Sequence, residues 1–373
     1  MTLRLCGALV AAAALAASPA SAHAPLYHKL SLLHVPSARV SLSADYACAA
    51  SPSGGLVDGG SVAITFSSSA PSATDLILAY APLPANVSMM APVEWFFAAA
   101  ADPAYLSTGA GALSARLVDV RAAYTFALAT GGLARPVLRA LSAPVTFANA
   151  NAPRAARLAV TGVATEMRIA WSSASAALHP AVILAAQGVV APASSSLTWT
   201  ATDLCGPPAT TVGWREPGYV HSAVLSGLVP GRSYSYTVGD DSGRSQAYTF
   251  TQPSASAYPF SISVLGDMGS DSLDGSAVER AFPPAPNTTR LIAADIDAGL
   301  SHAVLHVGDL SYAMGYESSW DFLFDIISTA NVIAPRVPYH INQGSEWWAR
   351  PPNPALSRRH ARRRPPHPLL LFF

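Results

Sequence analysis

The sequence predicts a multidomain protein in which two β-sandwich domains precede an α/β region. Short apolar runs separated by clusters of Gly, Pro and Ser fill residues 36–147, and a second all-β stretch fills residues 153–254. From residue 259 onward, two continuous apolar runs flank a helix-like segment, which is typical of parallel strands joined by a crossover helix. A chain of 373 residues is long enough for two or three domains.

The composition gives no sign of a nucleic-acid-binding surface. The chain has 22 basic and 22 acidic residues, so its formal net charge is zero. Lys29 is the only lysine, and the arginines before residue 344 are scattered among acids and form no basic stripe. We therefore expect no nucleic-acid partner.

Residues 1–22 have the pattern of a secretory signal peptide. Arg4 precedes an apolar run over residues 5–17, and Ala-Ser-Ala at 20–22 forms a cleavage site before His23. The alternative, a membrane anchor, needs about 20 apolar residues, and this run is shorter. No later segment is long and apolar enough to span a bilayer. We expect a protein that is secreted to the extracellular space or delivered to a vacuole.

Cysteines and glycosylation sequons fit a secreted product. Cys6 is removed with the signal peptide, so the mature chain retains Cys48 and Cys205, which permit at most one internal disulfide. Whether they pair is left open. Asn86 and Asn287 each begin an Asn-X-Ser/Thr triplet and are candidate glycosylation sites.

The first β domain is predicted from four short runs, at residues 61–66, 75–80, 116–120 and 124–129. No motif in it carries chemistry. Residues 149–153, which read Asn-Ala-Asn-Ala-Pro, have the composition of a linker.

The second β domain is predicted to be of the fibronectin type III kind. Residues 167–171 alternate like a half-buried strand, and residues 222–225 lead into a tight turn followed by Tyr234. A tyrosine just past such a turn closes a sandwich corner when its hydroxyl bonds back to the main chain. The alternative, that Tyr234 and Tyr236 are two ordinary core tyrosines, predicts the same sandwich.

The α/β region begins with an apolar strand at residues 260–265, followed by a helix-like segment at 289–298 and a second apolar strand at 303–307. The first strand ends at Asp267 and the second at Asp309, each preceded by a glycine. A further helix-like run covers 320–330, and a short apolar piece follows at 337–339.

Paired carboxylates at the ends of neighbouring parallel strands suit a two-metal site. The carboxyl ends of such strands meet in one crevice, which brings Asp267 and Asp309 together. Two metal ions about 3.5–4 Å apart can hold a phosphate and lower the pKa of a bound water. Tyr312 follows Asp309 by three residues and makes the pattern more specific than either Gly-Asp pair alone.

With these residues the sequence resembles the purple acid phosphatases, within the metallophosphoesterase superfamily. Residues 266–269 read Gly-Asp-Met-Gly and residues 308–313 read Gly-Asp-Leu-Ser-Tyr-Ala, which match the first two blocks of that family. The resemblance implies that Asp267 binds Fe(III), that Asp309 bridges Fe(III) and a divalent metal (Zn, Mn or Fe), and that Tyr312 is a tyrosinate ligand.

The resemblance extends to the β domains. Residues 205–219 look like the fibronectin-like domain of the large plant-type members. Residues 130–133 and 144–149 look like the extra amino-terminal domain of a subgroup often labelled probable inactive purple acid phosphatase or nucleotide pyrophosphatase-like. The resemblance therefore covers residues from about 60 to 344.

The chain departs from the family at the third block. The family has Gly-Asn-His there, whereas Gly344 is followed by Ser345 and Glu346. Three further histidine ligands belong downstream, where the chain has no room for them. His306 reads as a core residue, and the two histidines nearest the chain end, His360 and His367, lie in the tail. The resemblance thus implies a truncated catalytic domain over residues 259–344.

The tail, residues 345–373, is an aberrant segment rich in Arg and Pro with no helical or strand period. We interpret it as the product of a frameshift, a retained intron or a mispredicted exon. The alternative is a natural basic disordered tail.

Two functions follow. The leading one is acid-phosphatase-type hydrolysis of phosphate esters or nucleotides at an Fe(III)–M(II) centre, with this truncated chain itself inactive. The alternative is a non-catalytic secreted β-sandwich binding protein that carries a vestigial catalytic fragment. A third interpretation, an adhesion-receptor fragment, does not explain the two Gly-Asp blocks. The substrate, the divalent metal and the oligomeric state are left open.

Overall fold

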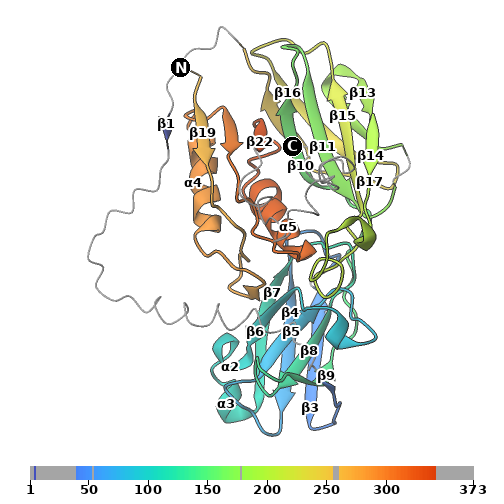
Figure 1. Ribbon diagram of the computed structural model, residues 1–373, viewed down its shortest axis with the longest axis vertical. Helices are drawn as coiled ribbons and strands as arrows, with labels where there is room; N and C mark the ends of the chain where they lie inside the picture. Colours follow the sequence, from blue (N-terminus) through green and yellow to red (C-terminus); the bar gives the residue numbers. More distant parts are fainter. Residues whose placement is uncertain (1–3, 6–38, 53, 177–178, 255–259, 342–373) are drawn as a thin grey trace, which may run out of the picture.

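The computed structural model describes residues 4–5, 39–52, 54–176, 179–254 and 260–341 (Figure 1). The predicted tail at 345–373 and most of the predicted signal peptide lie outside these ranges. The chain forms two β-sandwiches followed by an α/β region, so the predicted fold class is confirmed. No helix within these ranges is long and apolar enough to cross a membrane.

The first sandwich packs a six-stranded sheet, in the order β2-β9-β8-β5-β6-β20, on a three-stranded sheet, β3-β4-β7. Its own strands are β2 (Arg39–Val40), β3 (Tyr46–Pro52), β4 (Gly60–Ser68), β5 (Leu76–Tyr80), β6 (Glu94–Phe97), β7 (Ala110–Leu117), β8 (Thr125–Thr130) and β9 (Val137–Leu141). The short helices are η2 (Val87–Met89), α2 (Ala98–Ala101) and α3 (Tyr105–Thr108).

Strand β5 shows why this sandwich is so apolar. Ile77 and Ala79 point into the core between the two sheets, whereas Leu76, Leu78 and Tyr80 belong to a second apolar cluster. All five residues are buried because the large sheet is covered on both faces. A strand of this kind reads as a continuous apolar run and not as an alternating one.

The second sandwich pairs the sheet β10-β11-β15-β14 with the sheet β13-β12-β16-β17, and β18 pairs with β16. The strands are β10 (Arg154–Val160), β11 (Met167–Ser173), β12 (Ala181–Leu184), β13 (Val189–Pro192), β14 (Ser195–Leu197), β15 (Tyr219–Leu225), β16 (Ser233–Asp240), β17 (Gly243–Arg244) and β18 (Tyr248–Thr251), with helices η3 (Ala185–Gln187) and η4 (Ala201–Asp203). The Tyr234 hydroxyl accepts a 2.8 Å hydrogen bond from the backbone N–H of Val229, so the predicted tyrosine corner is confirmed.

The α/β region is built on a four-stranded parallel sheet, β1-β19-β21-β22. The strands are β1 (Arg4–Leu5), β19 (Ile262–Leu265), β21 (Ala303–His306) and β22 (Tyr339–Ile341), and the helices are α4 (Ala285–Asp297), α5 (Glu317–Phe324) and the π-helical η5 (Asp325–Ala330). Helix α4 begins four residues before the predicted start at 289. Pro284 precedes it and Pro286 lies in its first turn, where no intrahelical N–H is needed.

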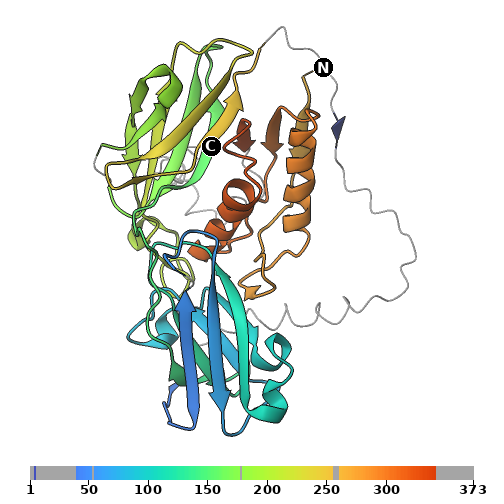
Figure 2. The ribbon, with the colours of Figure 1, turned by 180° about the vertical axis from the view of Figure 1, so that it is seen from behind.

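One strand of this region belongs to the first sandwich. Strand β20 (Ala277–Val278) lies between β19 and α4 in sequence, yet it pairs antiparallel with β6, with Ala277 opposite Trp95 and Val278 opposite Glu94. The sequence predicted only a polar connection there. Figure 2 shows α5 in the middle of the molecule, beside the second sandwich and above the first. The α/β region is therefore attached to both sandwiches.

Candidate active site

The structure brings Asp267 and Asp309 together at the carboxyl ends of two adjacent parallel strands. Strands β19 and β21 are in register, with Leu265 opposite His306, so the loops that follow them start side by side. The backbone N–H of Asp267 donates to the carbonyl of Gly308 at 3.3 Å. The N–H of Met268 donates to the carbonyl of Asp309 at 3.2 Å. The two Gly-Asp turns thus hold each other through their main chains.

The backbone of this site is strained. Asp267, Asp309 and Tyr312 have φ values of 54°, 52° and 49°, in the left-handed region that non-glycine residues rarely adopt. Each such residue costs on the order of 1–3 kcal/mol and persists only where its surroundings enforce the conformation, as they often do in active sites. Three of them within two adjoining loops mark this place as a candidate functional site.

Tyr312 connects the two carboxylates. Its hydroxyl donates to Asp267 Oδ1 at 2.8 Å and to Asp309 Oδ2 at 3.2 Å. Burial, and then the hydrogen bond to Asp267, raise the pKa of Tyr312 above its ordinary value. Asp267 is exposed and the other two are partly exposed, so all three side chains are open to solvent.

His306 is a buried core residue next to the site, and it interacts with the backbone and with the charge of Asp309. The ring is fully buried in β21, and its Nδ1 lies 2.9 Å from the hydroxyl of Tyr339. Burial lowers the pKa of His306 to about 4, although the nearby Asp309 opposes this. It behaves as the core residue that the sequence analysis expected. His360 and His367 lie outside the described residues.

The described residues do not complete a two-metal centre. They contain no group of three or more His, Cys, Asp or Glu side chains placed to hold a metal ion. Asp267, Asp309 and Tyr312 offer three side chains with oxygen donors and no imidazole. Oxygen donors suit a hard cation, but three of them are too few for two ions. The positions where the family has its Asn-His block lie outside the described residues.

The glycosylation candidates occupy different kinds of surface. Asn86 is exposed in a loop, where its side chain caps η2 by accepting from the backbone of Ser88 at 3.1 Å. Asn287 is exposed in the first turn of α4, and the hydroxyl of Thr289 in the same triplet is buried and donates to the carbonyl of Ala285 at 3.2 Å. The geometry favours Asn86 over Asn287, because acceptor triplets usually occupy surface loops.

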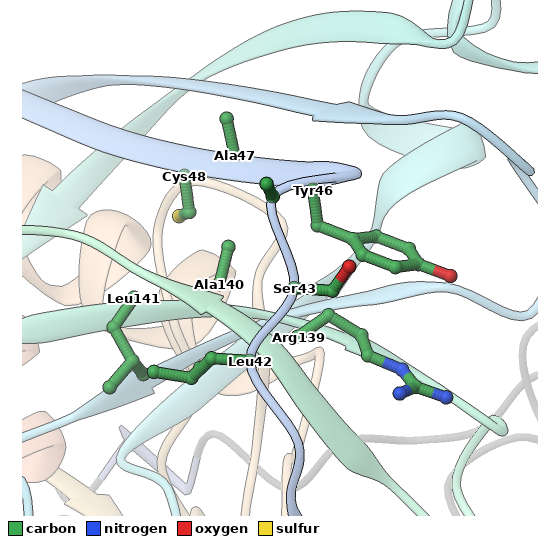
Figure 3. A pocket seen from close by; sticks show the side chains of 9 residues that line it. Leu42, Ser43, Tyr46, Ala47, Cys48, Arg139, Ala140 and Leu141 are labelled. Carbon is green, nitrogen blue, oxygen red and sulfur yellow. The ribbon is translucent and has the colours of Figure 1, made fainter.

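Neither cysteine belongs to the cluster formed by Asp267, Asp309 and Tyr312. Cys48, in the first sandwich, and Cys205, in the second, are both free in the structure. Cys48 lines an open groove of about 480 Å³, whose lining also includes Leu42, Tyr46 and Arg139 (Figure 3). The Arg139 guanidinium lies 5.6 Å from the centre of the Tyr46 ring.

Two β-sandwiches followed by parallel strands that end in aspartates define the class of this protein, a multidomain protein with a metallophosphoesterase-type α/β region. A family model for the Fn3-like domain from purple acid phosphatase matches residues 50–149. A second, for the purple acid phosphatase N-terminal domain, matches residues 153–252. The chain belongs to the purple acid phosphatase family.

Comparisons with individual proteins also lead to purple acid phosphatases. The solved structure of a purple acid phosphatase from yellow lupin (Lupinus luteus) seeds matches with a TM-score of 0.72 and 33% identity, over 81% of this chain and 57% of that one. Probable inactive purple acid phosphatase 1 of Arabidopsis thaliana is 35% identical over 76% of this chain and 50% of its own length. Probable inactive purple acid phosphatase 27 of the same plant is 36% identical over 68% and 43%. The chain thus spans about half the length of these two relatives.

Proposed function

We propose that this protein belongs to the phosphate-ester hydrolases of its family and that Asp267, Asp309 and Tyr312 are the oxygen ligands of an Fe(III)–M(II) centre, with Zn, Mn or Fe as the divalent metal. The observation that carries the proposal is the single hydroxyl of Tyr312 hydrogen-bonded to both carboxylates. Phosphate esters or nucleotides would be the substrates. The bound metals would supply an acidified water as the nucleophile.

We also propose that the 373-residue chain does not catalyse by itself. Among its described residues the site provides three ligand side chains, whereas two ions need more ligands and the usual sites of such metals include imidazole. The names of the two Arabidopsis relatives, each called probable inactive, agree with this proposal.

The test uses the whole chain, expressed with its leader through a secretory pathway. On addition of Fe(III), we expect a visible tyrosinate charge-transfer band that is absent in Tyr312→Phe. We expect no hydrolysis of p-nitrophenyl phosphate at acidic pH, with Fe(III) and Zn present, above that of the double variant Asp267→Asn/Asp309→Asn. Hydrolysis that requires both aspartates would refute inactivity, and absence of the band would refute the metal assignment.

We propose further that residues 1–22 direct secretion and are removed, and that Asn86 and Asn287 are glycosylation sites. Strand β1 (Arg4–Leu5) lies within this leader, so removal of the leader leaves β19 as the edge strand of the parallel sheet. Amino-terminal sequencing of the secreted product is expected to begin at His23. Asn86→Gln is expected to cause a larger loss of glycan mass than Asn287→Gln, because only Asn86 lies in a loop. Equal occupancy would contradict that ranking.

A second candidate function is non-catalytic binding through the first sandwich. The open groove beside Tyr46 and Arg139 favours it, because an aromatic ring and a guanidinium next to apolar Leu42 can contact a sugar-like ligand (Figure 3). A glycan array probed with the whole chain and with Tyr46→Ala tests this function. Binding that is lost in the variant supports it, and no binding by either protein rejects it.

A further inference from the structure

Phe282 lies directly against Tyr312. The two rings are stacked, with centroids 4.5 Å apart and an angle of 26° between their planes. Phe282 comes from the connection between β20 and α4, whereas Tyr312 follows β21, so this contact joins two loops that are far apart in sequence. The sequence analysis did not single out Phe282, which stands in a stretch with no apolar period.

The Phe282 ring also packs closely against Gly269. A Cβ atom at Gly269 would fall well inside van der Waals contact with the Phe282 ring, so only glycine allows this approach. Gly269 also has a φ of 69°, which glycine adopts without strain. The glycine that closes the Gly-Asp-Met-Gly block therefore makes room for Phe282.

The main chain of Phe282 is attached to the same loop. Its N–H donates to the carbonyl of Ser270 at 2.9 Å, and Ala281 forms a parallel bridge with Ser270. The loop that carries Asp267 thus holds Phe282 through backbone contacts, and the ring of Phe282 stacks on Tyr312.

We infer that Phe282 is a positioning residue for Tyr312: its ring restricts the phenol to the orientation in which one hydroxyl reaches both Asp267 and Asp309. Tyr312 is partly exposed, and the two carboxylates hold its hydroxyl, so the stacked Phe282 ring adds a second restraint, on the face of the phenol. Stacked aromatic pairs at this separation have a preferred geometry, which a branched aliphatic side chain does not impose. The importance of this orientation rests on the proposed function of Tyr312 as a metal ligand. The stacking of the two rings is observed independently of that function.

The test compares variants that keep or remove the flat ring. Phe282→Tyr keeps it, and Phe282→Leu and Phe282→Met keep apolar bulk without it. The first measurement needs no metal: ¹⁹F NMR of the whole chain labelled with 3-fluorotyrosine, in which Tyr312→Phe identifies the Tyr312 signal. We expect that signal to move toward the position of free 3-fluorotyrosine in the Leu and Met variants and to stay in place in Phe282→Tyr.

The second measurement is a titration with Fe(III), followed by the charge-transfer band. We expect the Leu and Met variants to bind up to about tenfold more weakly, which is the most that an aromatic pair of this kind contributes. Phe282→Tyr is expected to bind like the wild type. The thermal midpoint of each variant shows whether it is folded, and using two non-aromatic variants keeps the test decisive if one fails to fold.

The possible results distinguish the proposed function of Tyr312 as a metal ligand from the positioning role of Phe282. If the wild type gives no charge-transfer band while its Tyr312 signal still depends on an aromatic residue at position 282, the proposed function fails and the positioning role stands. If the Tyr312 signal is the same in Phe282→Leu, Phe282→Met and the wild type, the positioning role is overturned, whatever the metal does. Equal effects of Phe282→Tyr and Phe282→Leu would overturn it as well.

Discussion

The two sandwiches and the α/β region differ in how they obtain their cores. Each sandwich buries a cluster drawn largely from its own strands, such as the one around Trp171 and Tyr236 in the second sandwich. The main cluster of the α/β region instead includes Ala155, Trp199 and Val220 of the second sandwich. The region that carries the candidate site therefore depends on its neighbours for part of its apolar packing.

The charged contacts show the same difference. Helix α5 places Asp321 at the junction, where Arg121 of the first sandwich forms a bidentate pair with it at 2.7 and 2.9 Å and Arg154 of β10 contacts the same carboxylate. Next to it, Arg116 forms a bidentate pair with Asp325 at 2.6 and 2.8 Å. These pairs join the two sandwiches to the α/β region through α5 and η5.

The largest expected effect comes from breaking this junction with Asp321→Asn. Burial opposes ionisation of Asp321, but Arg121 and Arg154 together lower its pKa below the ordinary range. Removing the charge leaves two buried guanidinium groups without their shared partner. We expect a loss of about 3–5 kcal/mol in the free energy of unfolding, measured by urea denaturation of the whole chain.

The matched control is Asp297→Asn on α4. Asp297 also forms an arginine pair, with Arg336 at 2.5 Å, but its side chain is 64% exposed. Exposed pairs contribute little, so we expect a change below about 1 kcal/mol. Equal costs for the two substitutions would show that the junction is no more important than a surface pair, and the comparison between the regions would lose its basis.

The strands that were located from the sequence could be predicted because their apolar patterns are local. Residues 167–171 and the corner at Tyr234 are examples. The predicted strand at 116–120 is wrong in its second half, since β7 runs over Ala110–Leu117. That strand consists largely of Ala, Gly and Ser, whose apolar signal is weak, and the chain leaves the sheet at Val118, whose carbonyl accepts the hydroxyl of Tyr124.

Part of the candidate site could also be predicted because its sequence pattern is local. Asp267 and Asp309 follow apolar strands, so the edge of the sheet where they lie could be deduced from the pattern. Phe282 and strand β20 could not, because a two-residue strand and a single aromatic residue in a polar stretch have no period. Ion pairs such as that between Arg121 and Asp321 depend on contacts across 200 residues and leave no local signal.

Tyr124 in the first sandwich and Tyr234 in the second each form a corner in which the hydroxyl bonds to the main chain a few residues upstream, so the two corners can be compared. The hydroxyl of Tyr124 donates to the carbonyl of Val118 at 2.7 Å, and both residues are essentially fully buried. The hydroxyl of Tyr234 accepts from the N–H of Val229, a residue that is 53% exposed. Water can replace the lost partner at the second corner but not at the first.

We therefore expect Tyr124→Phe to lower the free energy of unfolding by about 1–3 kcal/mol, the cost of a buried polar group left without its hydrogen bond. Tyr234→Phe is expected to cost about 0.5–1 kcal/mol, the net value of an ordinary hydrogen bond. Urea denaturation of both variants shows which substitution lowers the free energy of unfolding more. If Tyr234→Phe costs more than Tyr124→Phe, the exposure of the hydrogen-bond partner does not determine how much each tyrosine hydroxyl stabilises the fold.

The last expected effect is a pH dependence to which Glu317 at the junction contributes. Burial, and then the nearby Asp321, raise the pKa of Glu317 from its ordinary 4.5 to about 8, although Arg121 and Arg215 oppose this. An acid whose pKa is raised by folding stabilises the folded state while it is protonated. Its contribution is complete below pH 4.5 and is lost as the pH rises through about 8.

Glu317→Gln isolates this contribution, because glutamine cannot ionise. In the second sandwich, burial lowers the pKa of His221 from 6.5 to about 4, so that histidine destabilises the fold only below about pH 6.5. Measurements at pH 6.5 and 8 therefore avoid it. Between these values we expect the wild type to lose on the order of 1 kcal/mol more than Glu317→Gln, since Glu317 keeps some exposure. Parallel losses in both proteins would place the pH dependence outside the junction.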